Sequence, residues 1–150
     1  MIKKLNIENR KAKFNFEFIQ TLECGLVLTG TEVKSIRASN ASIAESFCQI
    51  KNQELYLINM YIKEYELGTY ANHQPRRERK LLIKAEELKK LHKAVKEKGL
   101  TLVPVRLYFN DKNKVKIKVA LGKGKKIHDK RHVLKEKDLG RDLRRVVKNY

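Results

Sequence analysis

The chain has 150 residues, of which 35 are Lys or Arg and 17 are Asp or Glu, so its formal net charge is +18, and 41% of its residues are apolar. A chain of this length normally folds as one domain with a useful core. A packed domain with this much excess charge is typical of proteins that bind a polyanion, and it excludes many ordinary enzymes. We expect nucleic acid as the partner, with an anionic membrane surface as the second candidate.

The location of the protein is predicted from what its sequence lacks. Residues 1–10 contain no apolar core of a signal peptide, and no stretch approaches the roughly 18 apolar residues of a membrane span. Cys24 and Cys48 do not form a Cys-x-x-Cys motif, which favours small core residues in a reducing compartment over a functional thiol. We therefore expect a soluble, cytoplasmic protein with no membrane partner.

The first half of the chain predicts three strands and one short helix. Phenylalanines that alternate with polar residues indicate a strand near residues 12–22. Thr29 and Glu32 have the spacing of a capping box, which predicts the start of a short helix. Apolar segments at 43–50 and 55–58, joined by a polar turn, predict a hairpin.

The second half predicts a loop, a helix and a second hairpin. Residues 66–79 lose all apolar periodicity, so we expect an exposed loop there. A short strand at 81–83 is followed by an amphipathic helix that ends at Gly99. The alternating segments 103–109 and 115–121 predict two strands joined by a tight turn.

This order of elements predicts the domain organisation. About six antiparallel strands with short helices favour a mainly β fold, an oligonucleotide-binding-type closed β-barrel, which we assign as the RNA-binding domain to residues 1–122. Residues 123–150 are a separate basic tail with a net charge of +7 and a weak helical stripe of apolar residues. We expect this tail to be flexible and disordered when free, and helical when a partner supplies a surface.

No group of residues supports catalysis. The glycines at 122–124 lack the spacing of a phosphate-binding loop, and no Ser or Cys lies in a nucleophile turn. His128 and His132 would share a helix face, but no third ligand lies near them, so phosphate or base contact is favoured over a metal ion. We expect no enzymatic activity, no metal and no cofactor.

Three groups of mainly basic residues are candidates for RNA contact. Guanidinium, imidazole and amide groups can stack on unpaired bases and bind phosphates, and phosphate affinity accumulates with each contact. The simpler alternatives are a helix start with a solvated face, a solvated loop, and a strand face that only aids solubility. The three groups are Glu32, Lys34, Ser35 and Arg37; Asn72, His73, Arg76, Arg77, Arg79 and Lys80; and Lys114, Lys116 and Lys118.

Four segments give the sequence a specific resemblance. They are residues 9–12 (NRKA), 25–35 (GLVLTGTEVKS), 72–82 (NHQPRRERKLL) and 124–131 (GKKIHDKR). In this order and at this spacing they resemble the SsrA-binding protein (small protein B) family, over residues 9 to 140. Charge alone does not give this specificity.

The resemblance implies a bacterial ribosome-rescue factor that acts in trans-translation and does no chemistry itself. The barrel would bind the tRNA-like domain of transfer-messenger RNA (tmRNA, or SsrA RNA) near its elbow and accompany it to ribosomes stalled on messages without a stop codon, where incomplete proteins are tagged for degradation. The tail would enter the decoding centre of the small subunit and the empty message channel. Its residues there would be Lys125, Lys126, His128, Asp129, Lys130 and Arg131.

The same resemblance implies a monomer, with elongation factor Tu in the delivery complex through the RNA. Because a carboxylate that faces RNA is unfavourable, we expect Glu32 to accept base N–H groups or to orient a neighbouring Lys or Arg, in addition to capping the helix. Glu32→Gln is then expected to keep the fold and lose RNA affinity. Two other interpretations stay open, a non-specific RNA-binding or RNA-chaperone barrel and a ribosomal structural protein.

Overall fold

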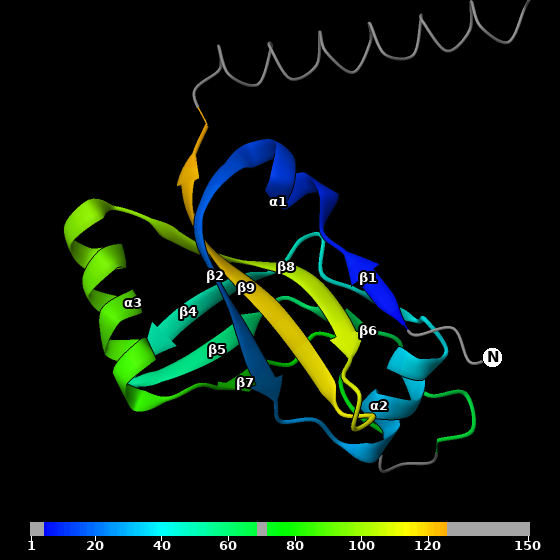
Figure 1. Ribbon diagram of the computed structural model, residues 1–150. Coiled ribbons are helices and arrows are strands. Elements are labelled where there is room, and N and C mark those ends of the chain that lie inside the picture. Colours follow the sequence, from blue (N-terminus) through cyan, green and yellow to red (C-terminus); the bar gives the residue numbers. More distant parts are fainter. Residues whose placement is uncertain (1–4, 69–71, 126–150) are drawn as a thin grey trace, which may run out of the picture.

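The protein is built around one antiparallel sheet, seen in a computed structural model that describes residues 5–68 and 72–125 (Figure 1). Seven strands run in the order β1-β8-β9-β2-β7-β5-β4, and β3 and β6 form a separate two-stranded ladder. The helices are α1 (Arg10–Asn15), α2 (Gly30–Arg37) and α3 (Ala85–Lys98). The strands are β1 (Asn6–Glu8), β2 (Phe16–Leu26), β3 (Ala41–Ser42), β4 (Phe47–Lys51), β5 (Glu54–Ile58), β6 (Tyr61–Ile62), β7 (Arg79–Leu82), β8 (Thr101–Phe109) and β9 (Val115–Gly124).

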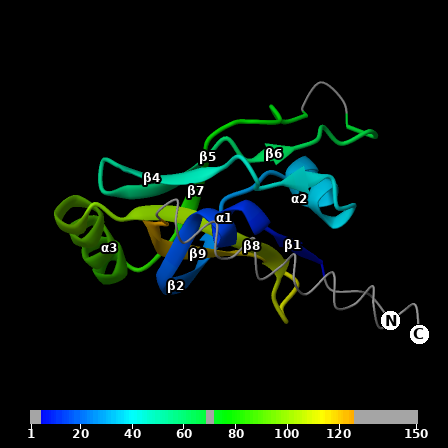
Figure 2. The ribbon, with the colours of Figure 1, turned by 90° about the horizontal axis from the view of Figure 1, so that it is seen from above.

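The sheet bends so that its two halves face each other across the core. Figure 2 shows β4 and β5 on one side and β8, β9 and β2 on the other, with α3 and α2 at opposite ends. Apolar side chains that alternate along the strands fill the space between the halves. Leu57 of β5, Leu107 of β8 and Ile117 of β9 are all fully buried there.

The predicted mainly β fold with short helices is confirmed, but the closed barrel is wrong because the sheet is open. Strand β4 contacts β8, yet no ladder joins them in the described residues. The second edge of β8 is occupied by β1, which pairs with residues 106–108. Nearer its start, β8 contains Pro104, which has no N–H for a ladder bond.

The Asn9 side chain lies where hydrogen bonds between β4 and β8 would otherwise close a barrel. Its side chain is buried and donates hydrogen bonds to the carbonyl oxygens of Ile43 (3.1 Å) and Pro104 (2.9 Å). Its Oδ1 accepts from the N–H of Ala12 at 3.1 Å and so caps α1. One side chain therefore ties the open edge of β8 to the loop before β4.

Most predicted elements are confirmed with shifted bounds: the strand expected from residue 43 begins at Phe47, and the strand expected at 81–83 is β7, Arg79–Leu82. The strand expected near residues 12–22 begins at Phe16, because residues 10–15 form α1 after the Asn9 cap. Both hairpins are present, as β4–β5 and β8–β9. The helix before the second hairpin ends as predicted at Gly99, whose φ of 63° is the left-handed conformation that glycine adopts most easily.

The two cysteines are unpaired and buried in the core, as predicted. Burial raises the pKa of the Cys24 thiol to about 11 and raises that of Cys48 as well. Both thiols are therefore protonated at neutral pH and pack as small apolar groups.

The end of the described chain lies just beyond the expected domain boundary. Strand β9 continues to Gly124, two residues past residue 122, and the N–H of Lys125 donates to the carbonyl of Asn15 at 2.9 Å. The rest of the predicted tail lies outside the described residues. None of the helices within 5–68 and 72–125 is long and apolar enough to cross a membrane.

Candidate nucleic-acid interface

A buried carboxylate organises the first two predicted groups. Glu32, in the first turn of α2, is fully buried, and its Oε1 accepts the N–H of Thr29 at 2.9 Å. This bond is half of the predicted capping box, which is present. Oε1 also accepts from Nε of Arg77 at 3.2 Å, and Oε2 accepts from Nε of Arg79. We call Glu32, Arg77 and Arg79 the Glu32 cluster.

Arg79 is the fully buried arginine of this cluster. Its guanidinium, fully buried at the start of β7, donates to the carbonyls of Met60 (2.7 Å), Arg77 (3.0 Å) and Pro75 (3.1 Å). A planar group with five N–H donors is suited to this arrangement, and an ammonium group is not. Arg79 therefore fixes the loop before β7 to both α2 and the chain after β5.

Asn72 and His73 hold the other end of the same loop. The side chain of Asn72 donates to the carbonyl of Tyr65 at 2.8 Å and accepts from the N–H of Tyr65 at 3.2 Å. The buried ring of His73 lies 2.9 Å from both the carbonyl of Ile62 and Oγ1 of Thr31. Because a carbonyl can only accept, Nε2 of His73 carries a proton and donates it to Ile62.

The Glu32 cluster is charged at neutral pH. Burial alone would raise the pKa of the Glu32 carboxyl, but hydrogen bonds from Arg77, from the Thr29 N–H and from Arg79 outweigh burial and lower it. Burial lowers the pKa of the Arg79 guanidinium, which still remains protonated. One carboxylate and two guanidinium groups leave one excess positive charge. It is on the side of Arg77, whose side chain is 32% exposed.

The exposed cations around the cluster rest on aromatic rings. Nζ of Lys34 lies 5.3 Å from the ring centroid of Tyr65, and Cζ of Arg76 lies 5.3 Å from that of Tyr61. Arg37, at the end of α2, lies 5.4 Å from the ring centroid of Phe109. Cation–π contact restrains these groups while leaving their donors available to a ligand.

Burial changes the interpretation of four predicted contact residues. Glu32, Ser35, His73 and Arg79 are 0%, 1%, 6% and 0% exposed, so in this conformation they cannot meet RNA directly. The loop expected to be exposed is therefore partly buried. Among them, Glu32 and Arg79 hold the partly exposed Arg77, whereas Lys34, Arg37 and Arg76 are exposed. The alternative role expected for Glu32, orienting neighbouring arginines, is the one that its geometry supports.

The third predicted group lies on a different surface, the outer face of the sheet. Lys116 and Lys118 of β9, with Lys114 just before it, point outward, and the intervening Val115 and Ile117 are buried, as the alternation predicts. Lys80 also points outward from β7, where Nζ forms an ion pair with Glu54 at 2.9 Å. The structure therefore brings the first two groups together around the Glu32 cluster, except for Lys80.

Most of the predicted tail contacts fall outside the described residues. These are Lys126, His128, Asp129, Lys130 and Arg131. Lys125 is described, and its Nζ donates to the carbonyl of Lys13 at 3.1 Å, against α1.

The aromatic partners of the cations were not predicted from the sequence. The cation–π pairs are Arg76 with Tyr61, Lys34 with Tyr65, and Arg37 with Phe109. In each pair, the ring and the cation come from different parts of the chain. No local sequence signal links such pairs. On β8, however, Arg106 and Tyr108 are two residues apart on one face, and a strand alternation should have drawn attention to them.

The fold and these surfaces define a class, a mainly β protein whose arginines and lysines are held on aromatic rings, an arrangement typical of nucleic-acid-binding proteins. The family model described as SmpB protein matches residues 6–149. The chain therefore belongs to the SmpB family.

Curated relatives and one solved structure agree with this membership. The SsrA-binding protein of Flavobacterium johnsoniae is 52% identical over 150 residues, which are 100% of this chain and 99% of the relative. That of Christiangramia forsetii is 49% identical over 150 residues, 100% of this chain and 96% of the relative. A solved structure described as "tmRNA-SmpB: a journey to the center of the bacterial ribosome" is 48% identical, with a TM-score of 0.67, and the match covers 81% of this chain and 85% of that chain.

Proposed function

We propose that this protein binds the tRNA-like domain of tmRNA and accompanies it to stalled ribosomes for trans-translation. The observation that carries this proposal is the Glu32 cluster, which joins α2 to the loop at 72–78 through buried hydrogen bonds. Membership of the SmpB family indicates which RNA is bound, since the curated relatives are SsrA-binding proteins. The solved relative is described with tmRNA and the bacterial ribosome.

A fixed basic surface suits a folded RNA better than an unstructured one. The exposed cations are already ordered by aromatic rings and by the Glu32 cluster, so little side-chain entropy is lost on binding. Phosphates and 2′-hydroxyls at fixed positions, as at the elbow of a tRNA-like fold, can then be matched by groups at fixed positions. We infer that Lys34, Arg37, Arg76 and Arg77 make these contacts.

The tail has a separate role in this proposal. Residues 126–150 carry much of the +7 net charge of residues 123–150. A segment with a net positive charge is attracted to a channel lined by ribosomal RNA. We propose that Lys125, Lys126, His128, Asp129, Lys130 and Arg131 act in the decoding centre and that the segment becomes helical there. The protein acts as a monomer, elongation factor Tu joins the complex through the RNA, and no catalysis by this chain is required.

The competing function is general RNA binding through charge alone. It accounts for the +18, but it leaves the buried arrangement around Glu32 without a purpose beyond stability. A ribosomal structural protein has the same weakness and, unlike a rescue factor, would be present in one copy per ribosome.

A titration against three RNAs tests the binding proposal. The full chain is titrated with the tRNA-like domain of tmRNA, an elongator tRNA and an unstructured RNA of equal length, at low and at physiological salt. A preference for the tRNA-like domain that persists at physiological salt is expected, because the counterion-release contribution to all three affinities falls as salt rises and specific contacts remain. Equal affinities that fall together as salt rises would contradict the proposal.

A further inference from the structure

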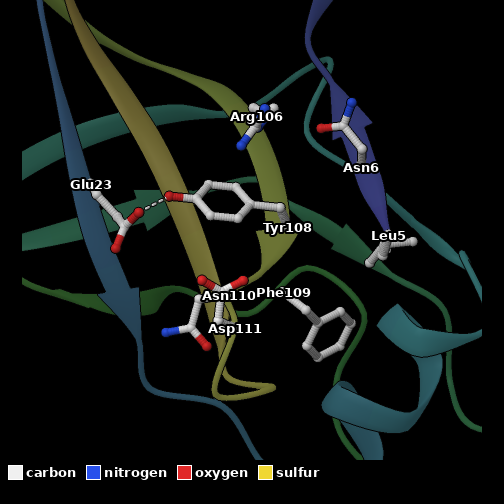
Figure 3. Close-up of a pocket in the computed structure, with 8 residues that line it drawn as sticks. All are labelled: Leu5, Asn6, Glu23, Arg106, Tyr108, Phe109, Asn110 and Asp111. Carbon is white, nitrogen blue, oxygen red and sulfur yellow. Dashed lines mark hydrogen bonds between the residues drawn. The ribbon is translucent and has the colours of Figure 1, made fainter. Parts of the chain in front are cut away.

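The outer face of the sheet contains a hollow beside the β8–β9 turn. It has a volume of about 460 Å³ and lies between β1, β2 and β8. Figure 3 shows the Tyr108 ring at its centre, with Glu23 of β2 on one side and Leu5 and Asn6, at the start of β1, on the other. Six of its lining residues are Leu5, Asn6, Glu23, Arg106, Tyr108 and Asp111.

Two planar groups form a fixed stack in this hollow. Cζ of Arg106 lies 4.3 Å from the ring centroid of Tyr108. Nε of Arg106 is buried and has no hydrogen-bond partner within the described residues, so contact with the ring contributes to holding the guanidinium in place. The hydroxyl of Tyr108 donates to Glu23. Burial, together with this bond, raises the pKa of Tyr108 to about 12, and the hydroxyl keeps its proton at neutral pH.

The charges in the hollow disfavour a phosphate. Glu23 and Asp111 bring two carboxylates into the lining against the one guanidinium of Arg106, and a carboxylate repels a phosphate. Aromatic and guanidinium planes, beside amide and carboxylate groups, instead match the flat face and the polar edge of a nucleobase. The chemistry therefore selects the base of a nucleotide and not its backbone.

The position of the hollow agrees with this ligand. Phe109, which also lines it, carries the guanidinium of Arg37 at the end of α2. On the other side, Tyr108 is directly opposite Lys116 of β9. A phosphate that contacts Lys116 therefore lies beside the hollow.

We propose that this hollow takes one unpaired nucleobase of a bound RNA, stacked on the planes of Tyr108 and Arg106. The proposal rests on the RNA-binding function proposed above, but it does not depend on tmRNA being the RNA. It assigns base contact to a part of the sheet where lysines on the neighbouring strand supply only phosphate contact.

The test compares single-stranded with fully paired RNA. The full chain is titrated with an unstructured RNA of about 16 nucleotides, the upper end of the site sizes for such folds, and with a blunt duplex that has the same number of phosphates. Tyr108→Leu removes the ring and keeps an apolar side chain. The matched control is Tyr56→Leu, because the Tyr56 hydroxyl donates to Glu54 (2.5 Å) and its ring contacts Lys51 (6.0 Å) in a similar arrangement outside this hollow.

Tyr108→Leu is expected to weaken binding of the single strand about 10-fold with an unchanged salt slope, because base stacking is not electrostatic. Duplex binding by this variant, and both affinities of Tyr56→Leu, should stay near those of the unmodified protein. Arg106→Gln removes the guanidinium plane and should show the same selectivity for the single strand. It decides the question if Tyr108→Leu does not fold, as judged by circular dichroism.

Two results would overturn the proposal. If Tyr108→Leu or Arg106→Gln weakens binding of both RNAs equally, the stack supports phosphate contact by its neighbours and holds no base. If a folded variant binds the single strand as the unmodified protein does, the hollow is not used. Failure of the protein to prefer the tRNA-like domain would contradict the proposed function and leave this comparison valid.

Discussion

Replacing Glu32 by Gln removes the carboxylate that faces two guanidinium groups. Glu32 and Arg79 are both fully buried, and removing one partner of a buried ion pair costs about 3–5 kcal/mol because the other charge stays buried without compensation. The new amide also turns an N–H donor toward Arg77 or Arg79, where each guanidinium can only donate. We therefore expect the free energy of unfolding to fall by about 3–5 kcal/mol, a cost that the sequence-based expectation of a retained fold and a lost RNA affinity did not include.

Urea unfolding followed by circular dichroism measures this change. The matched control is Glu54→Gln, since Glu54 pairs with Lys80 through side chains that are both 41% exposed, and its loss should change stability little. RNA affinity is measured under conditions in which both variants are folded, and only Glu32→Gln should lose it. A typical substitution changes the free energy of unfolding by about 1 kcal/mol. If the free energy of unfolding of Glu32→Gln differs from that of the unmodified protein by no more than this, the role given to the Glu32 cluster is refuted.

Three further changes have defined outcomes. The pKa of Glu32 is lowered in the folded protein, so its contribution to stability is complete above about pH 4.5 and is lost as pH falls through the lowered value. In urea titrations, the difference in free energy of unfolding between the unmodified protein and Glu32→Gln should therefore stay constant from pH 5 to 7 and shrink at lower pH. Gly99→Ala should lower the free energy of unfolding by about 1–2 kcal/mol in urea, because φ is 63° there and steric space is not limiting around the new Cβ. Gly30→Ala, at a helix start with equal space, should cost nothing, and equal costs would contradict the backbone argument. A chain that ends at Lys125 should bind the tRNA-like domain like the full chain in a gel-shift titration but support no tagging of incomplete proteins; tagging by this chain would show that the tail is not needed in the decoding centre.

Local sequence signals predicted the individual helices and strands well, but they did not predict whether the sheet closes into a barrel. The capping box of α2 and the left-handed glycine after α3 act within a few residues, so spacing alone is enough to identify them. Closure of the sheet depends on residues far apart in the chain. β1 pairs with β8 across about one hundred residues, and the bonds of Asn9 to Ile43 and Pro104 likewise have no local signature.

The site shows the same limit. The basic segments could be found by composition, but exposure could not be assigned, because a strand alternation does not extend into an irregular loop. Arg79 is a clear case. Among five consecutive charged residues, its position as the first residue of β7 turns the side chain inward to Glu32, while Arg76 remains outside. The identity of a residue gives its chemistry, and only the fold decides whether that chemistry is presented to RNA or used to hold the loop.

Reconstituted translation on a message without a stop codon tests the central claim most directly. Stalled ribosomes are supplied with alanine-charged tmRNA and elongation factor Tu, with and without the full chain, and the nascent polypeptide is followed as it gains the tag. Tagging is expected only when the protein is present, and it should be lost with Glu32→Gln at a temperature where that variant is folded. Tagging at the same rate without the protein, or none with it, would contradict the account.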